Sequence, residues 1–224
     1  MKKVIFIMLV AAFSVASVNA QLNFGVKAGL NASTINGFSE FEEGFSLDAT
    51  YRPGFHIGVA AQCMFTPQMG IETGLYYSTL GINTGMKMLG IELLSMNVNT
   101  SYLQLPVSFL YKFNVGQDLD IYPSVGIYLG YGLDGKLKVK SDLPLEDLDV
   151  EIPDDVSFFD SIEKGGLGSN RFDMGATIGL NLQYSKFTIG VGYDLGFLKI
   201  NNKDSETPKD WTNGNVKVSV GYFF

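Results

Sequence analysis

The chain has 224 residues, a formal net charge of −7, one histidine and one cysteine. An acidic chain of this kind is a poor candidate for nucleic-acid binding, and a single cysteine cannot form a disulfide within the chain. One histidine and one cysteine also cannot make a zinc site, so we expect neither a metal nor a cofactor.

The first 20 residues have the organisation of a secretory signal peptide. Two lysines open the segment, residues 4–18 are apolar or small, and Val18 and Ala20 occupy the small-residue positions of a cleavage site. The apolar run is too short for a transmembrane helix. We therefore expect cleavage after Ala20, export of the chain, and a mature protein of residues 21–224.

The remainder of the chain alternates between apolar and small or polar residues in eight segments. Each segment has about ten or more residues, which is longer than most strands of soluble sheets and suits a tilted strand that crosses a membrane. An even strand number is typical of single-chain outer-membrane barrels. The pattern predicts an all-β fold, an eight-stranded antiparallel up-and-down transmembrane β-barrel. In chain order, the expected strands are 22–33, 53–65, 70–81, 101–113, 120–134, 171–185, 187–199 and 215–224.

The connections between these segments alternate between long and short. Long and short loops that alternate place all the long ones at one end, as in outer-membrane barrels with long extracellular loops and short periplasmic turns. We therefore expect the protein in the outer membrane, with both chain ends on the periplasmic side. The expected long loops are 34–52, 82–100, 135–170 and 200–214, and the short ones are 66–69, 114–119 and 185–186.

The apolar face of the strands has aromatic residues at both ends and aliphatic residues between them. Aromatic rings favour the interfaces of a membrane, so this face is expected to contact lipid while the glycine-rich, polar face fills the interior. The alternative is a soluble lipocalin-like barrel that binds a small molecule, with its apolar face inward. The expected periplasmic girdle is Phe24, Phe65, Tyr111, Phe113, Tyr184, Phe187, Tyr222 and Phe224, and the outer girdle is Phe55, Tyr77, Tyr131, Phe172 and Phe197.

Six charged residues lie on the face that is expected to line the interior, three of each sign. An eight-stranded barrel is only wide enough to be filled by side chains, so these charges need partners. We expect Glu72 to pair with Lys112, and Asp194 with Lys217, as a structural network rather than an ion path. The six residues are Lys27, Glu72, Lys112, Asp173, Asp194 and Lys217.

His56, the single histidine, falls on the inner face near the outer rim. Some eight-stranded outer-membrane barrels are lipid A-modifying enzymes that use a histidine with a serine and an acid near that rim. Because the sequence places no serine beside His56, we expect no catalytic residues and no enzyme. A small pore is a third hypothesis, but the lumen of eight strands is too narrow for appreciable conductance.

The last strand ends in a terminal aromatic residue on the apolar face. Gly221, Tyr222 and Phe224 look like the C-terminal signal that the outer-membrane barrel assembly machinery recognises. This machinery is therefore an expected partner during biogenesis, together with outer-membrane lipid.

Five strand motifs together resemble a known family. They are LNFGVKAGLNAS, YLQLPVSFLYKF, YPSVGIYLGYGL, RFDMGATIGLNLQY and VKVSVGYFF. In this order and spacing they are similar to the PorT-like outer-membrane β-barrel proteins of Bacteroidota. The resemblance implies an outer-membrane location and no catalytic residues, and it leaves envelope or secretion-system proteins as partners. PorT is linked to the type IX secretion apparatus, but no residue of this chain marks a role in secretion.

Overall fold

The computed structural model describes residues 21–38, 48–88, 91–141, 156–201 and 210–224. The expected signal peptide lies outside these ranges, as do parts of the four long connections. Ten strands and one short 3₁₀ helix, η3 (Ile162–Lys164), are assigned in the described part. The strands are β1 (Gln21–Asn36), β2 (Asp48–Met64), β3 (Met69–Met88), β4 (Ile91–Tyr111), β5 (Phe113–Gly116), β6 (Leu119–Ser141), β7 (Val156–Ser157), β8 (Phe172–Tyr184), β9 (Phe187–Gly196) and β10 (Thr212–Phe223).

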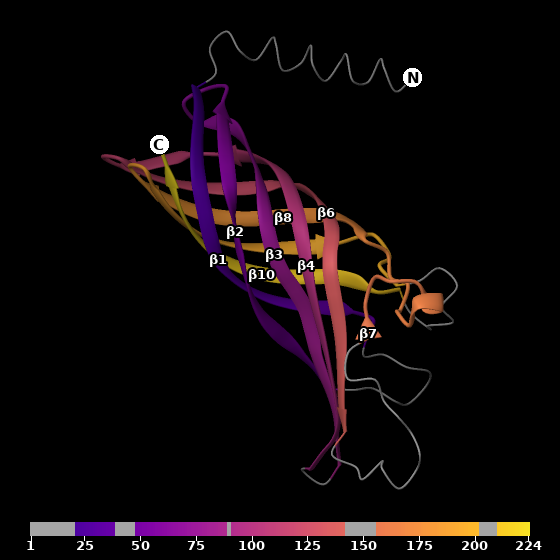
Figure 1. Ribbon diagram of the computed structural model, residues 1–224. Helices are drawn as coiled ribbons and strands as arrows, with labels where there is room; N and C mark the ends of the chain where they lie inside the picture. The colour runs from indigo at the N-terminus through magenta and orange to yellow at the C-terminus, as the bar shows by residue number, and fades with distance from the viewer. Residues whose placement is uncertain (1–20, 39–47, 89–90, 142–155, 202–209) are drawn as a thin grey trace, which may run out of the picture.

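The strands form one closed antiparallel barrel (Figure 1). Neighbours follow the order β4-β3-β2-β1-β10-β9-β8-β6, and pairing of β4 with β6 closes the ring. The short β5 resumes the path of β4 after Lys112 and pairs with β6, whereas the two-residue β7 adds to the outer part of β6. Eight strands therefore make up the wall, which confirms the predicted fold class.

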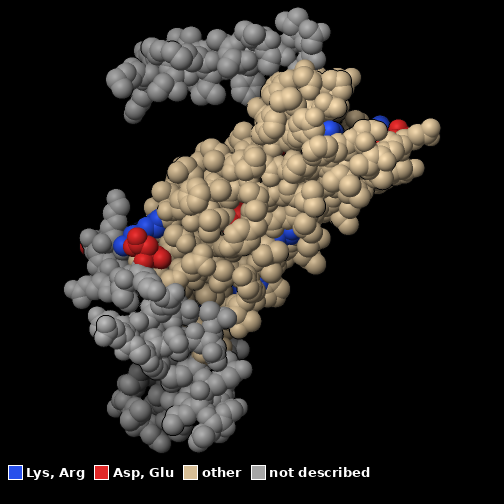
Figure 2. Space-filling view, turned by 180° about the vertical axis from the view of Figure 1, so that it is seen from behind, with Lys and Arg blue, Asp and Glu red and all other residues tan. Residues whose placement is uncertain are grey.

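The apolar face of each wall strand points outward. In β1, Leu22, Phe24 and Leu30 are 54%, 57% and 70% exposed, whereas Lys27 and Asn31 on the opposite face are buried. Charged side chains are sparse along the wall in Figure 2 and gather near its ends. Exposed apolar side chains around the whole wall match a lipid-facing surface and contradict the lipocalin-like alternative, which needs an apolar interior. None of the helical segments within the described ranges has the length and apolar character needed to cross a bilayer.

The aromatic residues of the apolar faces group at the two ends of the wall. At the inner end, the rings of Phe187 and Tyr222 lie 4.9 Å apart between centroids, and those of Tyr222 and Phe224 lie 5.7 Å apart. At the outer end, Tyr131 lies 6.3 Å from Phe172 on the neighbouring strand. These contacts place the aromatic residues as two girdles, where amphipathic rings favour the bilayer interface.

The segment 82–100 is almost entirely strand, so the prediction of a long loop there was wrong. β3 runs to Met88 and β4 begins at Ile91, and these two strands and β6 continue past the ends of β8, β9 and β10 (Figure 1). The other long connections are also shorter than expected, because β1 reaches Asn36, β2 begins at Asp48, β6 reaches Ser141 and β10 begins at Thr212.

The polarity of the two faces reverses along these strands, which explains the error. In the part of β4 that follows Ser101, the outward-pointing Leu103 is apolar and exposed. In the outer part, which precedes Ser101, the polarity is opposite: the outward-pointing Asn99 is exposed, and the inward-pointing Val98 is fully buried. The ladder between β4 and β6 has a register shift at Ser101/Tyr102, and that between β2 and β3 shifts between Tyr51 and His56. Bulges of this kind are frequent at barrel rims. The reversal marks the level where lipid gives way to water.

A hydrophobic core fills the outer end of the barrel. The segment 156–171, which we call the outer cap, inserts Phe158 and Phe159 among inward-facing residues of the extended strands. A side chain at Gly132 of β6 would overlap the ring of Phe159, so the glycine makes the insertion possible. Arg171 holds the base of the cap, because its guanidinium donates to the carbonyl of Leu133 at 2.9 Å and lies 5.0 Å from the centre of the Phe159 ring.

Candidate functional site: the polar barrel interior

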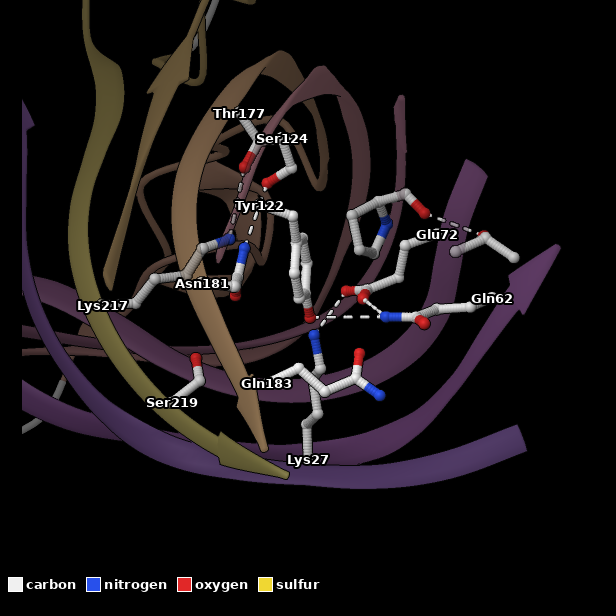
Figure 3. A network of polar contacts seen from close by, with 12 residues as sticks. Lys27, Gln62, Glu72, Tyr122, Ser124, Thr177, Asn181, Gln183, Lys217 and Ser219 are labelled. Carbon is white, nitrogen blue, oxygen red and sulfur yellow. Dashed lines mark hydrogen bonds and ion pairs between the residues drawn. The ribbon is translucent and has the colours of Figure 1, made fainter. Parts of the chain in front are cut away.

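Two interior charges in the half of the lumen away from the outer cap form an ion pair that differs from the expected one. Lys27 Nζ lies 2.5 Å from Glu72 Oε1 (Figure 3). Lys112 Nζ instead donates to the side-chain oxygens of Gln62 at 3.1 Å and Gln183 at 2.8 Å. The expected pairing of Glu72 with Lys112 was therefore wrong. The reason is Gln62, whose Nε2 donates to Glu72 while its Oε1 accepts from Lys112, so that the amide separates the two charges.

The second expected ion pair is present. Lys217 Nζ lies 2.6 Å from Asp194 Oδ1, and the carboxylate is almost fully buried. Lys217 of β10 stands opposite Gly192 of β9, and its side chain passes over that glycine, where a Cβ atom would lie 3.1 Å from Cε of the lysine. The register of the last hairpin and a missing side chain at Gly192 together bring the two charges into contact.

Asp173 and Lys112 are the two interior charges without an opposite charge within 4 Å, as far as the described residues show. Asp173 is fully buried and accepts hydrogen bonds from the hydroxyl of Tyr128 at 3.1 Å and the amide of Asn213 at 2.8 Å. Both neutral donors reach the same carboxylate oxygen, Oδ2, whereas Oδ1 is buried without a hydrogen-bond partner among the described residues. The interior is therefore a connected polar packing in which only part of the charge is paired.

His56 has two hydrogen-bond partners that the sequence did not predict. Its Nδ1 lies 2.8 Å from Asn31 Oδ1 and its Nε2 lies 3.0 Å from Ser219 Oγ. The amide nitrogen of Asn31 donates to the carbonyls of Phe55 and Thr79, so its oxygen must face the histidine. His56 consequently carries its proton on Nδ1, and the hydroxyl of Ser219 donates to Nε2.

Ser219, His56 and Asn31 are hydrogen-bonded in the sequence hydroxyl, imidazole, amide, which resembles the arrangement of a catalytic triad. Here it borders an interior cavity of about 80 Å³, also lined by Lys27, Asp194 and Lys217. A space of this size holds a few water molecules and no acyl chain of a lipid. The outer cap packs over one end of the lumen, and the fully buried Tyr122 lies in the half away from the cap. The arrangement suits a packed interior better than a reaction site.

Strand register is the information that the sequence pattern lacked. Ser219 of β10 and His56 of β2 are both partners of Gly29 on β1, one on each side. Alternation assigned Asn31 and Ser219 to the inner face but gave no sign of which residues on other strands they would meet. Across the described ranges, the structure arranges no group of three His, Cys, Asp or Glu residues that could hold a metal ion.

Comparison with known proteins places this architecture in a family. No curated protein matches the chain. Among solved structures, the chain is similar to Ail, the attachment invasion locus protein of Yersinia pestis (16% identity, 90% of this chain and 98% of that chain covered, TM-score 0.42). It is also similar to Neisserial surface protein A (10% identity, 92% and 99% covered, TM-score 0.46) and to a major outer membrane protein from Thermus thermophilus (17% identity, 91% and 100% covered, TM-score 0.47).

The family model for the outer membrane protein beta-barrel domain matches residues 16–202, which is most of the chain. This match agrees with the closed eight-stranded wall, the outward-facing apolar side chains and the two aromatic girdles. The chain belongs to the outer-membrane β-barrel protein family.

Proposed function

We propose that this protein is a non-enzymatic outer-membrane barrel that acts through its extracellular part, as a structural and interaction protein of the cell envelope. The observation that carries the proposal is the contrast between the two parts of the molecule. The membrane-spanning part is filled with side chains, whereas the outer part has a hydrophobic core of its own and presents the cap to the exterior.

The filled interior argues against transport. Six charged residues, buried tyrosines and amides occupy the lumen, and a cavity of about 80 Å³ lies between some of them. Eight strands enclose an interior that side chains can fill, and larger barrels are those that leave channels. The outer end is thus the part of the molecule available for recognition.

The outer cap has an exposed apolar residue away from the lipid-facing wall. Ile162, on the 3₁₀ helix of the cap, is 66% exposed while the neighbouring Phe158 and Phe159 are buried. A single exposed apolar residue needs no special explanation. At the outer end of the molecule, however, it gives the best position from which to probe for a protein contact.

A photoreactive amino acid at position 162 tests the proposal on intact cells. The matched control carries the same amino acid at Gln117, in the exposed turn between β5 and β6 at the opposite end. We expect a defined envelope protein cross-linked to position 162 and not to position 117. A cysteine at position 162, with Cys63 replaced by serine, should react with a membrane-impermeant maleimide. Protection of this cysteine on intact cells would place the cap in the periplasm and overturn the proposal.

The lipid A-modifying alternative gains one observation from the structure, the hydrogen-bonded series of Ser219, His56 and Asn31. The location of this series weighs against the alternative. The three residues face the interior, and the neighbouring wall residues that face the bilayer are aliphatic, so the scissile bond of a lipid has no route to Ser219. We therefore retain the non-enzymatic proposal.

We further propose that residues 1–20 are a cleaved signal peptide and that Gly221, Tyr222 and Phe224 are recognised by the barrel assembly machinery. Exposure of Phe224 at the inner rim, next to Tyr222, supports the second point. The strand motifs that resemble PorT-like proteins of Bacteroidota support membership of that narrower group. A secretion-system protein is one candidate for the cross-linked partner.

A further inference from the structure

The outward face of the sheet beyond the lipid-facing wall has a regular arrangement of polar residues on three adjacent strands. We call it the polar sheet face. It is contributed by the outer parts of β3, β4 and β6, which pair in unbroken register over the three rows given next. Its lateral rows, read from β3 to β6, are Thr79, Ser101 and Asp134; Gly81, Asn99 and Lys136; and Asn83, Asn97 and Lys138.

The depth of this face follows from its continuity with the aromatic girdle. Tyr77 belongs to the outer girdle, and its hydroxyl is 2.8 Å from Ser101 Oγ in the first row of the polar sheet face. Leu103, two residues after Ser101 and on the same side of β4, is exposed on the lipid-facing wall. Successive rows rise by about 7 Å along a strand, since outward residues are two apart. The rows therefore lie at the depth of the lipid head groups and just above it.

The chemistry of this face suits sugar hydroxyls. Its central residues, Asn83, Asn97, Asn99 and Ser101, are uncharged and carry both donors and acceptors. Asn83 stands directly opposite Asn97, and Asn99 is the most exposed of the four. Carboxamides and hydroxyls hydrogen-bond to sugar hydroxyls in both directions, whereas an acyl chain offers them nothing.

We propose that the polar sheet face binds the sugar head groups of the glycolipid that forms the outer leaflet around the barrel. This inference rests on the outer-membrane placement of the proposed function and names one partner of the extracellular part. The occupant is the lipid already in contact with the wall below, so its acyl chains pack on the apolar band while its saccharide meets the amides above. Lys136 and Lys138 complete the second and third rows of the face on β6.

The experiment measures lipid enrichment around the mature barrel in bilayer discs. The discs contain phospholipid mixed either with the glycolipid bearing its core saccharide or with the same lipid lacking that saccharide. The test variant is Asn97→Ala with Asn99→Ala. The matched control removes two exposed amides at the opposite end, Asn114→Ala with Gln117→Ala. Protection of β8, β9 and β10 from amide exchange reports folding and insertion for every variant.

We expect the wild-type barrel to prefer the glycolipid with the core saccharide. The test variant should lose this preference by about fivefold or more, the effect of losing one or two net hydrogen bonds. The control variant should keep it, and high salt should leave it largely unchanged, because sugar hydroxyls are uncharged. Equal preference in the test variant and wild type would overturn the inference. Loss of the preference in high salt would assign it to phosphate and also overturn it.

Failure of the proposed function would look different. A barrel that stays outside the bilayer shows no amide protection in the discs, and this result contradicts the membrane placement itself. A barrel that inserts normally but shows no preference contradicts only the role of the polar sheet face. The two failures are therefore separated within one measurement.

Discussion

The imidazole of His56 lies across Gly29 on the neighbouring strand, where a Cβ atom would come within 2.6 Å of its Cε1. This placement lets one side chain from β2 span β1 and reach Ser219 on β10. A glycine in a strand interior often marks such a close approach. The cross-strand bridge thus depends on a residue that itself makes no side-chain contact.

Gly29→Ala should destabilise the barrel by about 1–3 kcal/mol, the usual cost of inserting a methyl group into a packed interior. The new methyl would meet the carbonyl of Val218 as well as the imidazole. Denaturant unfolding in lipid discs measures the change. The control is Gly116→Ala, where the nearest atom to an added Cβ is 3.9 Å away. In a His56→Ala background the cost of Gly29→Ala should fall, and an unchanged cost would contradict the contact.

His56→Ala should leave the lipid A of the cells unchanged, because the histidine faces the packed interior and not the bilayer. Mass spectra of lipid A from cells with the wild-type protein, the variant and no protein provide the measurement. We expect three identical spectra and a lower unfolding midpoint for the variant, whose Asn31 and Ser219 lose a buried partner. An acyl-chain difference between wild-type and protein-free cells that disappears with His56→Ala would favour the enzyme instead.

The interior ion pairs are distinguished by double-mutant cycles. Lys27→Met and Glu72→Met should couple by about 1–3 kcal/mol, since the two groups are in direct contact. Lys112→Met and Glu72→Met should couple less, because Gln62 lies between the two charges. Unfolding free energies of the single and double variants give both values. A larger coupling for the pair that contains Lys112 would show that the arrangement around Gln62 is wrong.

Phe159→Ala should loosen the outer cap without opening the wall. A buried phenylalanine contributes about 3–5 kcal/mol, and its ring packs against Tyr102 at 5.8 Å and under the guanidinium of Arg171. We expect faster proteolysis within residues 156–171 and unchanged amide protection of β8 and β9. Ile162→Ala, at an exposed position of the same cap, serves as the control and should alter neither. Equal effects of both variants would argue against a packed cap.

The alternation of residues was enough to predict the barrel and the side of the wall that each residue occupies. Contact with lipid favours an apolar side chain at every second position, and a narrow lumen favours glycine and polar residues at the others. The pattern alone therefore assigns Leu30 to the lipid-facing side and Asn31 to the interior. The same requirement placed the aromatic residues at the strand ends. This information is local, because it depends on the period of a strand and on its solvent.

The tertiary structure decided which interior residues meet and how far the strands continue. Periodicity gives a face but no lateral neighbour, and the neighbours of Glu72 and His56 follow from the register in which all eight strands close. Beyond the rim, water replaces lipid outside and the cap supplies an apolar cover inside, so the pattern at Val98 and Asn99 is opposite to that at Leu103 and Gln104. The alternation expected for a strand surrounded by lipid therefore stops at the rim, where water replaces the lipid. Only the packed hydrophobic core at the outer end shows that β3, β4 and β6 continue beyond it.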